Sequence, residues 1–348
     1  MIPRIEPHCQ IENHCDAPRR AWQELLSTAP RSTASLLKSL DLTDSAHATL
    51  ASDSDFPLRV PQPFVDRMQK GDPNDPLLLQ VLPRWEEQQA APGYSRDPLQ
   101  EQQFNVAPGL IHKYHGRALL ITAKACAIHC RYCFRRHFPY EDNQPSREQW
   151  QGALDYLAGD TSISEVIYSG GDPLAAGDRQ LAWLSEQIAA IPHIVRLRIH
   201  SRLPIVLPQR IDDALLDWLQ RWPGEKVMVV HSNHPNELDD SVATALEKLS
   251  RIGVTLLNQT VLLKGINDDE KILAELSEKL FGMGVMPYYL HVLDAVAGAA
   301  HFDISDDRAQ RIAGEISARL PGYLVPRLVR ENPNCSAKTP LTPILPAR

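Results

Sequence analysis

The chain has 348 residues, of which 43% are hydrophobic and 23% charged, and its formal net charge is −7. This composition is typical of a folded globular protein and argues against disorder, nucleic-acid binding and attachment to an anionic membrane. No run of 18 or more apolar residues occurs, and the first ten residues lack the apolar stretch of a signal peptide, so we expect a cytoplasmic protein.

Residues 1–105 are predicted to form a helical and irregular N-terminal region. Short amphipathic stretches, such as 21–27 and 35–40, alternate there with proline-rich connectors. Nine prolines between positions 57 and 108 exclude long regular elements, because proline lacks the backbone N–H donor and clashes with the preceding helical turn.

A repeating pattern of strand and helix begins near residue 118. Apolar runs that favour strands open near Ala118, Glu165, Val195, Lys226, Thr255 and Val285. Helix-patterned segments lie between them, and the later runs recur at about 30 residues. This spacing is typical of parallel β/α units, so we expect an α/β fold with a partial (β/α)6 barrel over 106–304, followed by a C-terminal segment over 305–348. A doubly wound open sheet is the alternative, because the spacing alone does not decide closure.

Polar residues follow the carboxyl ends of the predicted strands. They are Ser169 to Asp172, His200, Arg202, His231, Asn233, His234, Asn258, Gln259, His291 and Asp294. In parallel β/α folds the site is built at this end of the sheet. The sequence therefore predicts one shared pocket rather than a set of unrelated structural side chains.

Three of the six cysteines, Cys126, Cys130 and Cys133, form a C-x3-C-x2-C run directly after the first of these strands. Six cysteines are too few for a disulfide scaffold in a chain of this length, so reduced thiols that hold a metal fit better. A [4Fe-4S] cluster on three thiolates leaves one iron open to a substrate or cofactor. Zinc is the alternative, with His129 or His137 completing the site, because structural zinc usually takes four protein ligands.

This run resembles the cluster-binding motif of radical S-adenosylmethionine (SAM) enzymes, in which it follows the first strand of a partial barrel. The resemblance implies that Cys126, Cys130 and Cys133 hold a [4Fe-4S] cluster and that the open iron binds SAM. It also implies SAM contacts from Ser169, Gly170, Gly171, Asp172, His231 and Asn233. An external electron donor is then expected as a partner.

Across residues 60–340 the chain resembles the lysine 2,3-aminomutase family. The matching segments are PGLIHKYHGRALL, CRYCFRRHF, YSGGDPL, LPIVLPQRI, HSNHPNE, LNQTVLLKGIND and YYLHVLDAVAGAAHF. The short bacterial branch, which serves the β-lysyl modification of elongation factor P, looks most similar, because no cysteine follows Cys335 where the clostridial enzymes carry zinc-binding cysteines. The resemblance implies a radical aminomutase that converts L-α-lysine to β-lysine, with a functional link to elongation factor P and to the enzyme that ligates β-lysine to it.

The family also uses pyridoxal 5'-phosphate (PLP), which is held by a lysine near the C-terminus. Lys338 is the residue that aligns, although residues 332–337 replace the glycine run that commonly precedes it. Tyr114, Arg117 and Gln259 resemble family positions around PLP. A radical SAM enzyme without PLP is the alternative, and it would keep the cysteines but have no need for Lys338.

The resemblance implies that the substrate is held by charge at both of its ends. Arg135 resembles the family arginine that pairs with the substrate carboxylate, for which a guanidinium offers a planar two-point match. Asp294 and Glu331 match the positions that hold the distal ammonium, and the family's lysine enzymes usually have aspartate where this chain has Glu331. Acidic groups argue against glutamate as the substrate, whereas arginine remains an alternative to lysine.

Overall fold

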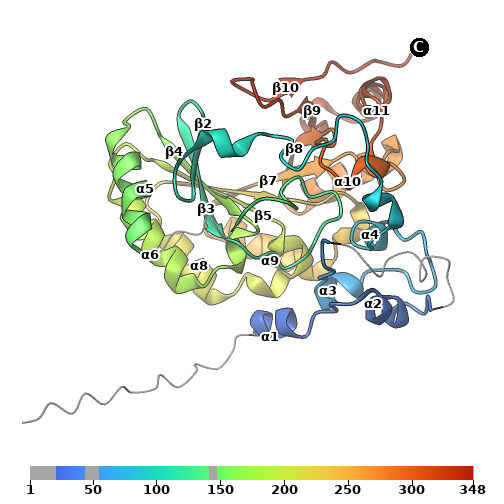
Figure 1. The fold of residues 1–348 in the computed structure, drawn as a ribbon, viewed down its shortest axis with the longest axis horizontal. Helices are drawn as coiled ribbons and strands as arrows, with labels where there is room; N and C mark the ends of the chain where they lie inside the picture. The colour runs from blue at the N-terminus through green and yellow to red at the C-terminus, as the bar shows by residue number, and fades with distance from the viewer. Residues whose placement is uncertain (1–20, 44–54, 141–146, 348) are drawn as a thin grey trace, which may run out of the picture.

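The computed structural model describes residues 21–43, 55–140 and 147–347. A ten-stranded sheet forms its centre, and the strands pair in chain order from β1 to β10 (Figure 1). The six predicted strands are β3 (Arg117–Ala123), β4 (Glu165–Gly170), β5 (Arg196–Ser201), β6 (Glu225–Val230), β7 (Val254–Val261) and β8 (Met286–His291). Each pairs in parallel with the next, which confirms the predicted α/β class built from parallel units.

Four further strands extend the sheet at its two edges. β1 (Asn105–Ala107) and β2 (Leu110–Tyr114) precede β3 in antiparallel pairing. β9 (Arg327–Arg330) pairs in parallel with β8, and β10 (Thr339–Pro340) pairs antiparallel with β9.

β9 is thus a seventh parallel strand beyond the six predicted, because a run of four residues is too short for its alternation to stand out in the sequence. Among the described strands no pairing joins β1 to β10, so the sheet is open, as expected for a partial barrel. The region boundaries at 105 and 304 stay predictions, and the sheet extends past 304 into β9 and β10.

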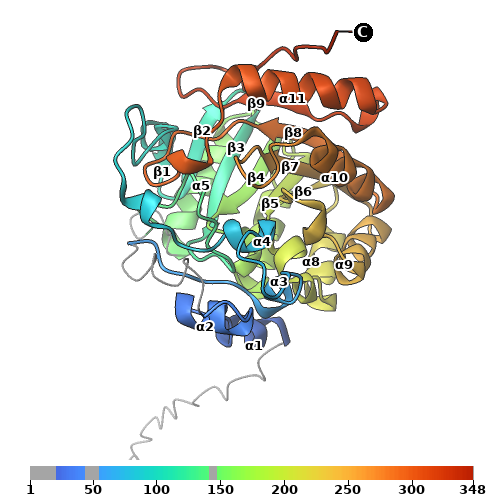
Figure 2. The ribbon, with the colours of Figure 1, turned by 90° about the vertical axis from the view of Figure 1, so that its right-hand side faces the viewer.

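Helices cover the outer face of this curved sheet (Figure 2). The long ones are α5 (Arg147–Gly159), α6 (Asp178–Ala189), α8 (Asp213–Arg221), α9 (Asp240–Arg251), α10 (Glu270–Gly282) and α11 (Asp306–Arg319). In α9 the buried residues Val242, Ala245, Leu246 and Leu249 recur at intervals of three and four, which gives the helix one apolar face against the sheet. Asp239 caps its N-terminus by accepting from the backbone N–H of Val242.

The predicted helical and irregular N-terminal region is confirmed over its described residues. Its elements are α1 (Ala21–Ser27), α2 (Thr33–Ser39), α3 (Gln62–Val65), α4 (Pro76–Leu79), η2 (Trp85–Gln88) and η3 (Glu101–Phe104). Pro76 is the first residue of α4, where its missing N–H removes no helical hydrogen bond. Trp22, Leu36 and Leu77 are buried in the same apolar core as Leu120 of β3, so this region packs onto the barrel.

Short helical turns occur in the loops after β4, β5, β6 and β8 and just before β9. They are η4 (Pro173–Ala175), α7 (Leu203–Val206), η5 (Pro208–Arg210), η6 (Pro235–Glu237), η7 (Ala300–Phe302) and η8 (Gly322–Leu324). None of the helices in the described ranges combines the length and the apolar composition that a membrane span requires.

Candidate active site

A cavity of about 1310 Å³ lies inside the curved sheet. Every residue with a predicted cofactor or substrate role lines it: Tyr114, Arg117, Cys126, Cys130, Cys133, Arg135, Ser169, Gly170, Gly171, Asp172, His231, Asn233, Gln259, Asp294, Glu331 and Lys338. Of the other polar residues predicted to share the pocket, His200, Arg202 and His291 also line it. His234 and Asn258 do not, because His234 caps η6 and Asn258 bonds to the backbone of Ser232. Tyr114 and Glu331, for example, are in hydrogen-bond contact although they are 217 positions apart. The fold therefore brings these groups together, while the role of each one stays a prediction.

The cysteine loop follows β3 and is fixed to the N-terminal region. Arg131, between the second and third cysteines, donates from Nε to Glu87 Oε1 at 2.7 Å and from its backbone N–H to the carbonyl of Gln80 at 2.9 Å. Arg136 donates to Glu87 Oε2 at 2.8 Å. One buried carboxylate from η2 therefore holds two arginines of the loop.

The three thiols form a donor set that suits a cationic cluster. Burial raises the pKa of Cys126, and negative charge on Cys133 raises it further. Burial and the charge of Cys130 likewise raise the pKa of Cys133 to about 12. Three thiolates in this setting need a metal cation beside them, and metal coordination deprotonates a thiol outright.

The two histidines of the zinc alternative are engaged elsewhere. His129 Nδ1 donates to the carbonyl of Pro57 at 2.8 Å, and His137 Nε2 donates to the carbonyl of Ala297 at 3.2 Å. Neither is among the described residues that line the cavity beside the thiols. The surroundings of the thiols therefore favour a cluster over a zinc site completed by these histidines.

Gly170 and Gly171 let the end of β4 close onto the start of the cysteine loop. Gly170 has φ +126°, and a Cβ there would lie 2.3 Å from the carbonyl oxygen of Ala123. A Cβ on Gly171 would lie 2.7 Å from the carbonyl oxygen of Ala125. Because these contacts involve backbone, a side chain at either position would push the two loops apart. The glycine pair therefore has a packing role in addition to its predicted contact with SAM.

Asp172 uses its carboxylate to hold the loop after β5. Its oxygens accept from Ser201 Oγ at 2.7 Å and from the backbone N–H groups of Arg202, Leu174 and Leu203 at 2.8 to 3.1 Å. Burial raises its pKa, which these hydrogen bonds oppose. The arrangement gives Asp172 a structural role, and its predicted contact with SAM stays a prediction.

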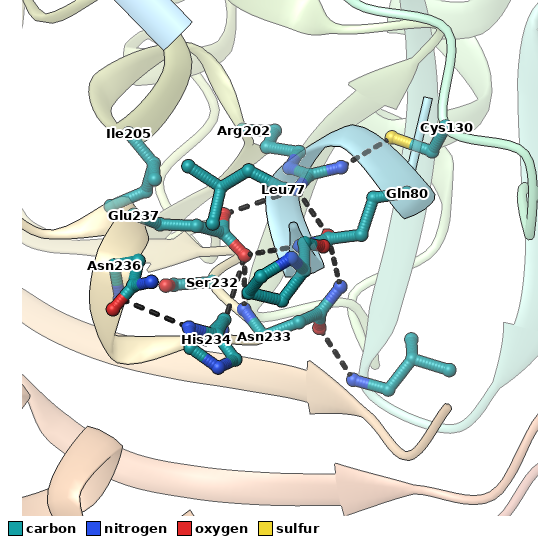
Figure 3. Close-up of polar contacts among 12 residues, drawn as sticks. Leu77, Gln80, Cys130, Arg202, Ile205, Ser232, Asn233, His234, Asn236 and Glu237 are labelled. Carbon is teal, nitrogen blue, oxygen red and sulfur yellow. Dashed lines mark hydrogen bonds and ion pairs between the residues drawn. The ribbon is translucent and has the colours of Figure 1, made fainter. Parts of the chain in front are cut away.

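Asn233 is similarly engaged within the protein (Figure 3). Its Nδ2 donates to Tyr132 OH at 2.6 Å and to Gln80 Oε1 at 3.0 Å, and its Oδ1 accepts from the backbone of Val261 at 2.9 Å. The amide thus ties the loop after β6 to α4, to the cysteine loop and to β7. Its predicted contact with SAM also stays a prediction.

Two histidines of the cavity have buried nitrogens that no described residue engages. They are Nε2 of His231 and Nε2 of His291. Burial lowers the pKa of His231 to about 4 and lowers that of His291 as well, so both rings are neutral at pH 7. A neutral imidazole can donate at one nitrogen and accept at the other. These atoms are thus available to polar groups of a bound cofactor.

Lys338 and Glu331 face each other across the hairpin of β9 and β10. Their Nζ and Oε2 atoms form an ion pair. Oε1 of Glu331 accepts from Tyr114 OH and from Lys113 Nζ, the latter at 3.1 Å. Burial raises the pKa of Glu331, but the charge of Lys338 and the hydrogen bonds outweigh it and the pKa falls to about 2. Glu331 is therefore ionised and engaged by this chain's own donors.

The residues predicted to surround PLP lie on the walls near this ion pair. The Arg117 guanidinium lies 4.6 Å from the centre of the Tyr114 ring. Lys338 Nζ lies 5.7 Å from the centre of the Tyr289 ring, and Tyr289 pairs with Gln259 in the sheet. These walls therefore offer a lysine amine, a guanidinium and hydroxyl groups, which suit an aldehyde cofactor that carries a phosphate.

Asp294, just after β8, is another acidic group that lines the cavity. Burial raises its pKa to about 7, and the charge of Lys338 acts in the opposite direction. Hydrogen bonds from the described residues do not contribute to this balance. Asp294 is thus the carboxylate that remains available to an incoming cation.

Arg135 is buried between the glycine-rich segment and η3. It forms an ion pair with Glu101, and its Nη1 donates to Ser169 Oγ at 2.9 Å and to the Gly170 carbonyl at 3.3 Å. The guanidinium carbon of Arg135 lies 5.0 Å from the centre of the Phe134 ring. The predicted partner of this arginine is the substrate carboxylate, whereas in the structure a carboxylate of the protein occupies that place.

The residues that hold these groups in position could not be recognised from the sequence. Glu101, Glu87 and Gln80 come from the N-terminal region, and Glu237 comes from η6. Their partners lie as many as 157 positions away, so no local motif marks them. Arg202 and His291 were visible only as polar residues after a strand.

Comparison with known proteins identifies the family. Residues 120–276 match the model of the Radical SAM superfamily. The chain is 53% identical over 326 residues to the L-lysine 2,3-aminomutase of Escherichia coli (strain K12), which covers 93% of this chain and 95% of that protein. It is 51% identical over 311 residues to the L-lysine 2,3-aminomutase of Haemophilus influenzae, which covers 89% and 92%.

Among solved structures, a native anSMEcpe with bound AdoMet and a Cp18Cys peptide matches with a TM-score of 0.44 and 12% identity, over 58% of each chain. Radical SAM proteins use a [4Fe-4S] cluster and SAM, and the lysine 2,3-aminomutases also depend on PLP. The extent and identity of the two matches to curated proteins place this chain in the L-lysine 2,3-aminomutase family of the radical SAM superfamily.

Proposed function

We propose that this chain converts L-α-lysine to β-lysine by moving the amino group from C2 to C3. The observation that carries the proposal is the meeting, in one cavity, of the three cysteine thiols, the Lys338 amine and the Asp294 carboxylate. Family membership supports the reaction type, and the acidic group supports a substrate with a distal cation.

The bound cofactors supply the difficult chemistry: the cluster with SAM provides a radical that removes an unactivated hydrogen, and PLP carries the migrating amino group. Cys126, Cys130 and Cys133 would hold the cluster, and Lys338 would hold PLP. Glu331 keeps the Lys338 amine inside the cavity, because the Nζ–Oε2 ion pair fixes the end of an otherwise flexible side chain.

The protein also has to orient the substrate by binding its carboxylate at one end and its ammonium at the other. Asp294 offers a carboxylate to the distal ammonium. Arg135 offers a guanidinium to the substrate carboxylate, which must either use the N–H groups that remain or replace Glu101. The cavity walls around these groups include Leu119, Ile167 and Leu293, whose apolar surfaces limit water near the reacting atoms.

In the cell, the enzyme would depend on an electron donor and supply its product to a second enzyme. An external donor would reduce the cluster in the cytoplasm. The β-lysine produced would be ligated to elongation factor P by a separate enzyme. The resemblance to the short bacterial branch supports this link.

The test is anaerobic incubation of the reconstituted protein with lysine, SAM, PLP and a reductant, followed by mass spectrometry of the amino-acid products after chiral separation. We expect β-lysine that requires each added component. Arginine and norleucine serve as parallel substrates. An amino shift on arginine but not on lysine would overturn the substrate, and product formed without PLP would overturn the reaction type.

A further inference from the structure

Arg202 lies just after β5 and points its guanidinium at a cysteine of the proposed cluster (Figure 3). Nη1 donates to Cys130 Sγ at 2.7 Å and to Tyr132 OH at 2.6 Å. Nη2 donates to Gln80 Oε1 at 2.7 Å and to Glu237 Oε2 at 3.1 Å. Only 5% of Arg202 is exposed, so these contacts form away from solvent.

A network of buried groups holds the Arg202 guanidinium next to Cys130. Glu237 is fully buried, and its Oε1 also accepts from the backbone N–H groups of Asn233 and His234 at 2.9 and 3.1 Å. Gln80 Nε2 donates to the same oxygen at 3.1 Å. Moving Arg202 out of this network would leave the buried Glu237 carboxylate without its cation, which is unfavourable. The contact with Cys130 is therefore held by Gln80 and Glu237, which lie outside the cysteine loop, and by Tyr132 within it.

We propose that Arg202 is a positioning residue that raises the reduction potential of the cluster by donating a hydrogen bond to the sulfur of Cys130. The inference rests on the proposed function, because it requires a [4Fe-4S] cluster on this cysteine. Uptake of one electron adds negative charge to the cluster and its thiolates. An N–H donor at a ligating sulfur stabilises that reduced form more than the oxidised one, and such bonds are among the factors that set cluster potentials.

The Glu237 carboxylate makes it possible to distinguish the effect of the N–H···S hydrogen bond on the reduction potential from the effect of the positive charge of Arg202. Glu237 compensates the positive charge of Arg202 within the network, so the pair presents little net charge at longer range. The hydrogen bond from Arg202 to the sulfur of Cys130 is therefore the interaction through which Arg202 acts on the cluster. Arg136 is a suitable residue for comparison with Arg202, because its guanidinium is also buried and also pairs with a carboxylate, that of Glu87. Its other hydrogen bonds are donated to the backbone carbonyls of Arg131 and Gly298.

The experiment is a redox titration of the reconstituted, full-length protein, monitored by electron paramagnetic resonance of the reduced cluster, with and without SAM. For Arg202→Gln we expect four irons per chain and a lower midpoint potential. The expected change is at least tenfold in the equilibrium constant for reduction, or about 59 mV for one electron. Arg136→Gln, the matched control, removes a buried charge but no bond to sulfur, and its shift should be less than a third as large.

Should Arg202→Gln fail to fold, Arg202→Lys decides the question. Its ammonium can face Glu237 but cannot span both Glu237 and Cys130, so the potential should again fall. A folded Arg202 variant with a full cluster and the wild-type potential would overturn the inference alone, as would an equal shift in Arg136→Gln. A wild-type protein that assembles no [4Fe-4S] cluster would overturn the proposed function and this inference with it.

Discussion

The carboxylate of Glu101 binds the guanidinium of Arg135 side-on, with Nε donating to Oε2 and Nη2 donating to Oε1, each at 2.7 Å. This two-point match is the geometry that a substrate carboxylate would also use. Gln100, just before Glu101, has φ +49°, a left-handed conformation that is uncommon for a residue other than glycine. The backbone is thus bent at the position that turns Glu101 toward Arg135.

Replacing Glu101 should destabilise the fold. Glu101→Gln leaves Arg135 buried without a counter-charge, so we expect the free energy of unfolding to fall by about 3 to 5 kcal/mol. Urea unfolding with a fluorescence readout measures this loss. Glu101→Asp keeps the charge and should lose less than half as much. Equal stability of Glu101→Gln and wild type would show that the pair contributes nothing to the fold.

Each cysteine of the loop should be required for the cluster. Alanine at Cys126, Cys130 or Cys133 should prevent assembly of four irons, because the remaining thiolates no longer complete the ligand set. Iron and sulfide analysis of anaerobically purified protein measures the outcome. Cys335→Ala is the matched control, since Cys335 is exposed. Cys9 and Cys15, which lie outside the described residues, should also be dispensable. A stable four-iron cluster in Cys130→Ala would contradict the assignment.

Lys338 should be the residue that carries PLP. We expect Lys338→Ala to lose the borohydride-fixed label and steady turnover while still binding the cluster and SAM, because those sites come from earlier strands. Peptide mapping after reduction locates the label. Lys113 is the sharpest control, because its amine contacts the same carboxylate, Glu331, at 3.1 Å. Lys113→Ala should keep the label, and a label found on Lys113 would reverse the assignment.

Asp294 should select lysine by charge. An ammonium about 4 Å from a carboxylate gains up to about 4 kcal/mol at an effective dielectric of about 20, and desolvation removes part of this. We expect Asp294→Asn to lower kcat/KM for lysine at least tenfold, about 1.4 kcal/mol, and to narrow its preference over norleucine. Asp294→Glu is the control that keeps the charge. An unchanged ratio of lysine to norleucine turnover in Asp294→Asn would place the ammonium elsewhere.

A substitution of Glu331 tests the choice of lysine as substrate less specifically than a substitution of Asp294. The Glu331 carboxylate also binds Lys338 and Tyr114, so its loss affects both. Glu331→Gln should therefore lower both the preference for lysine and the attachment of PLP. Loss of attachment is read by the absorbance of the bound cofactor. Full PLP occupancy in Glu331→Gln would show that the ion pair does not position Lys338.

Glu331 should also make stability depend on pH. Its pKa in the folded protein is about 2, below its ordinary value of 4.5, so the stability it contributes is present above pH 4.5 and is lost as the pH falls from 4.5 toward 2. The full contribution is about 3 kcal/mol. Unfolding free energies of wild type and Glu331→Gln, measured from pH 7 to pH 3, should converge as the pH falls. A constant difference across that range would contradict the prediction.

The sequence by itself determined the features that are local along the chain. The spacing of Cys126, Cys130 and Cys133 and the recurring strand and helix depend on residues a few positions apart, so they can be recognised without a structure. The same holds for the short helices of the N-terminal region, which prolines limit directly. These features were enough to predict the open α/β barrel and the family.

Only the tertiary structure decided which groups meet in the cavity. The hairpin of β9 and β10 brings Lys338 to Glu331, while η3 brings Glu101 to Arg135 across 34 positions. Arg202 reaches Cys130 across 72 positions. Such pairs form because the packing of the apolar core fixes the positions of the helices and strands. A charged side chain that is buried by this packing is stable only if an opposite charge or a hydrogen-bond partner lies beside it. A residue's type and neighbours in sequence carry no record of that partner.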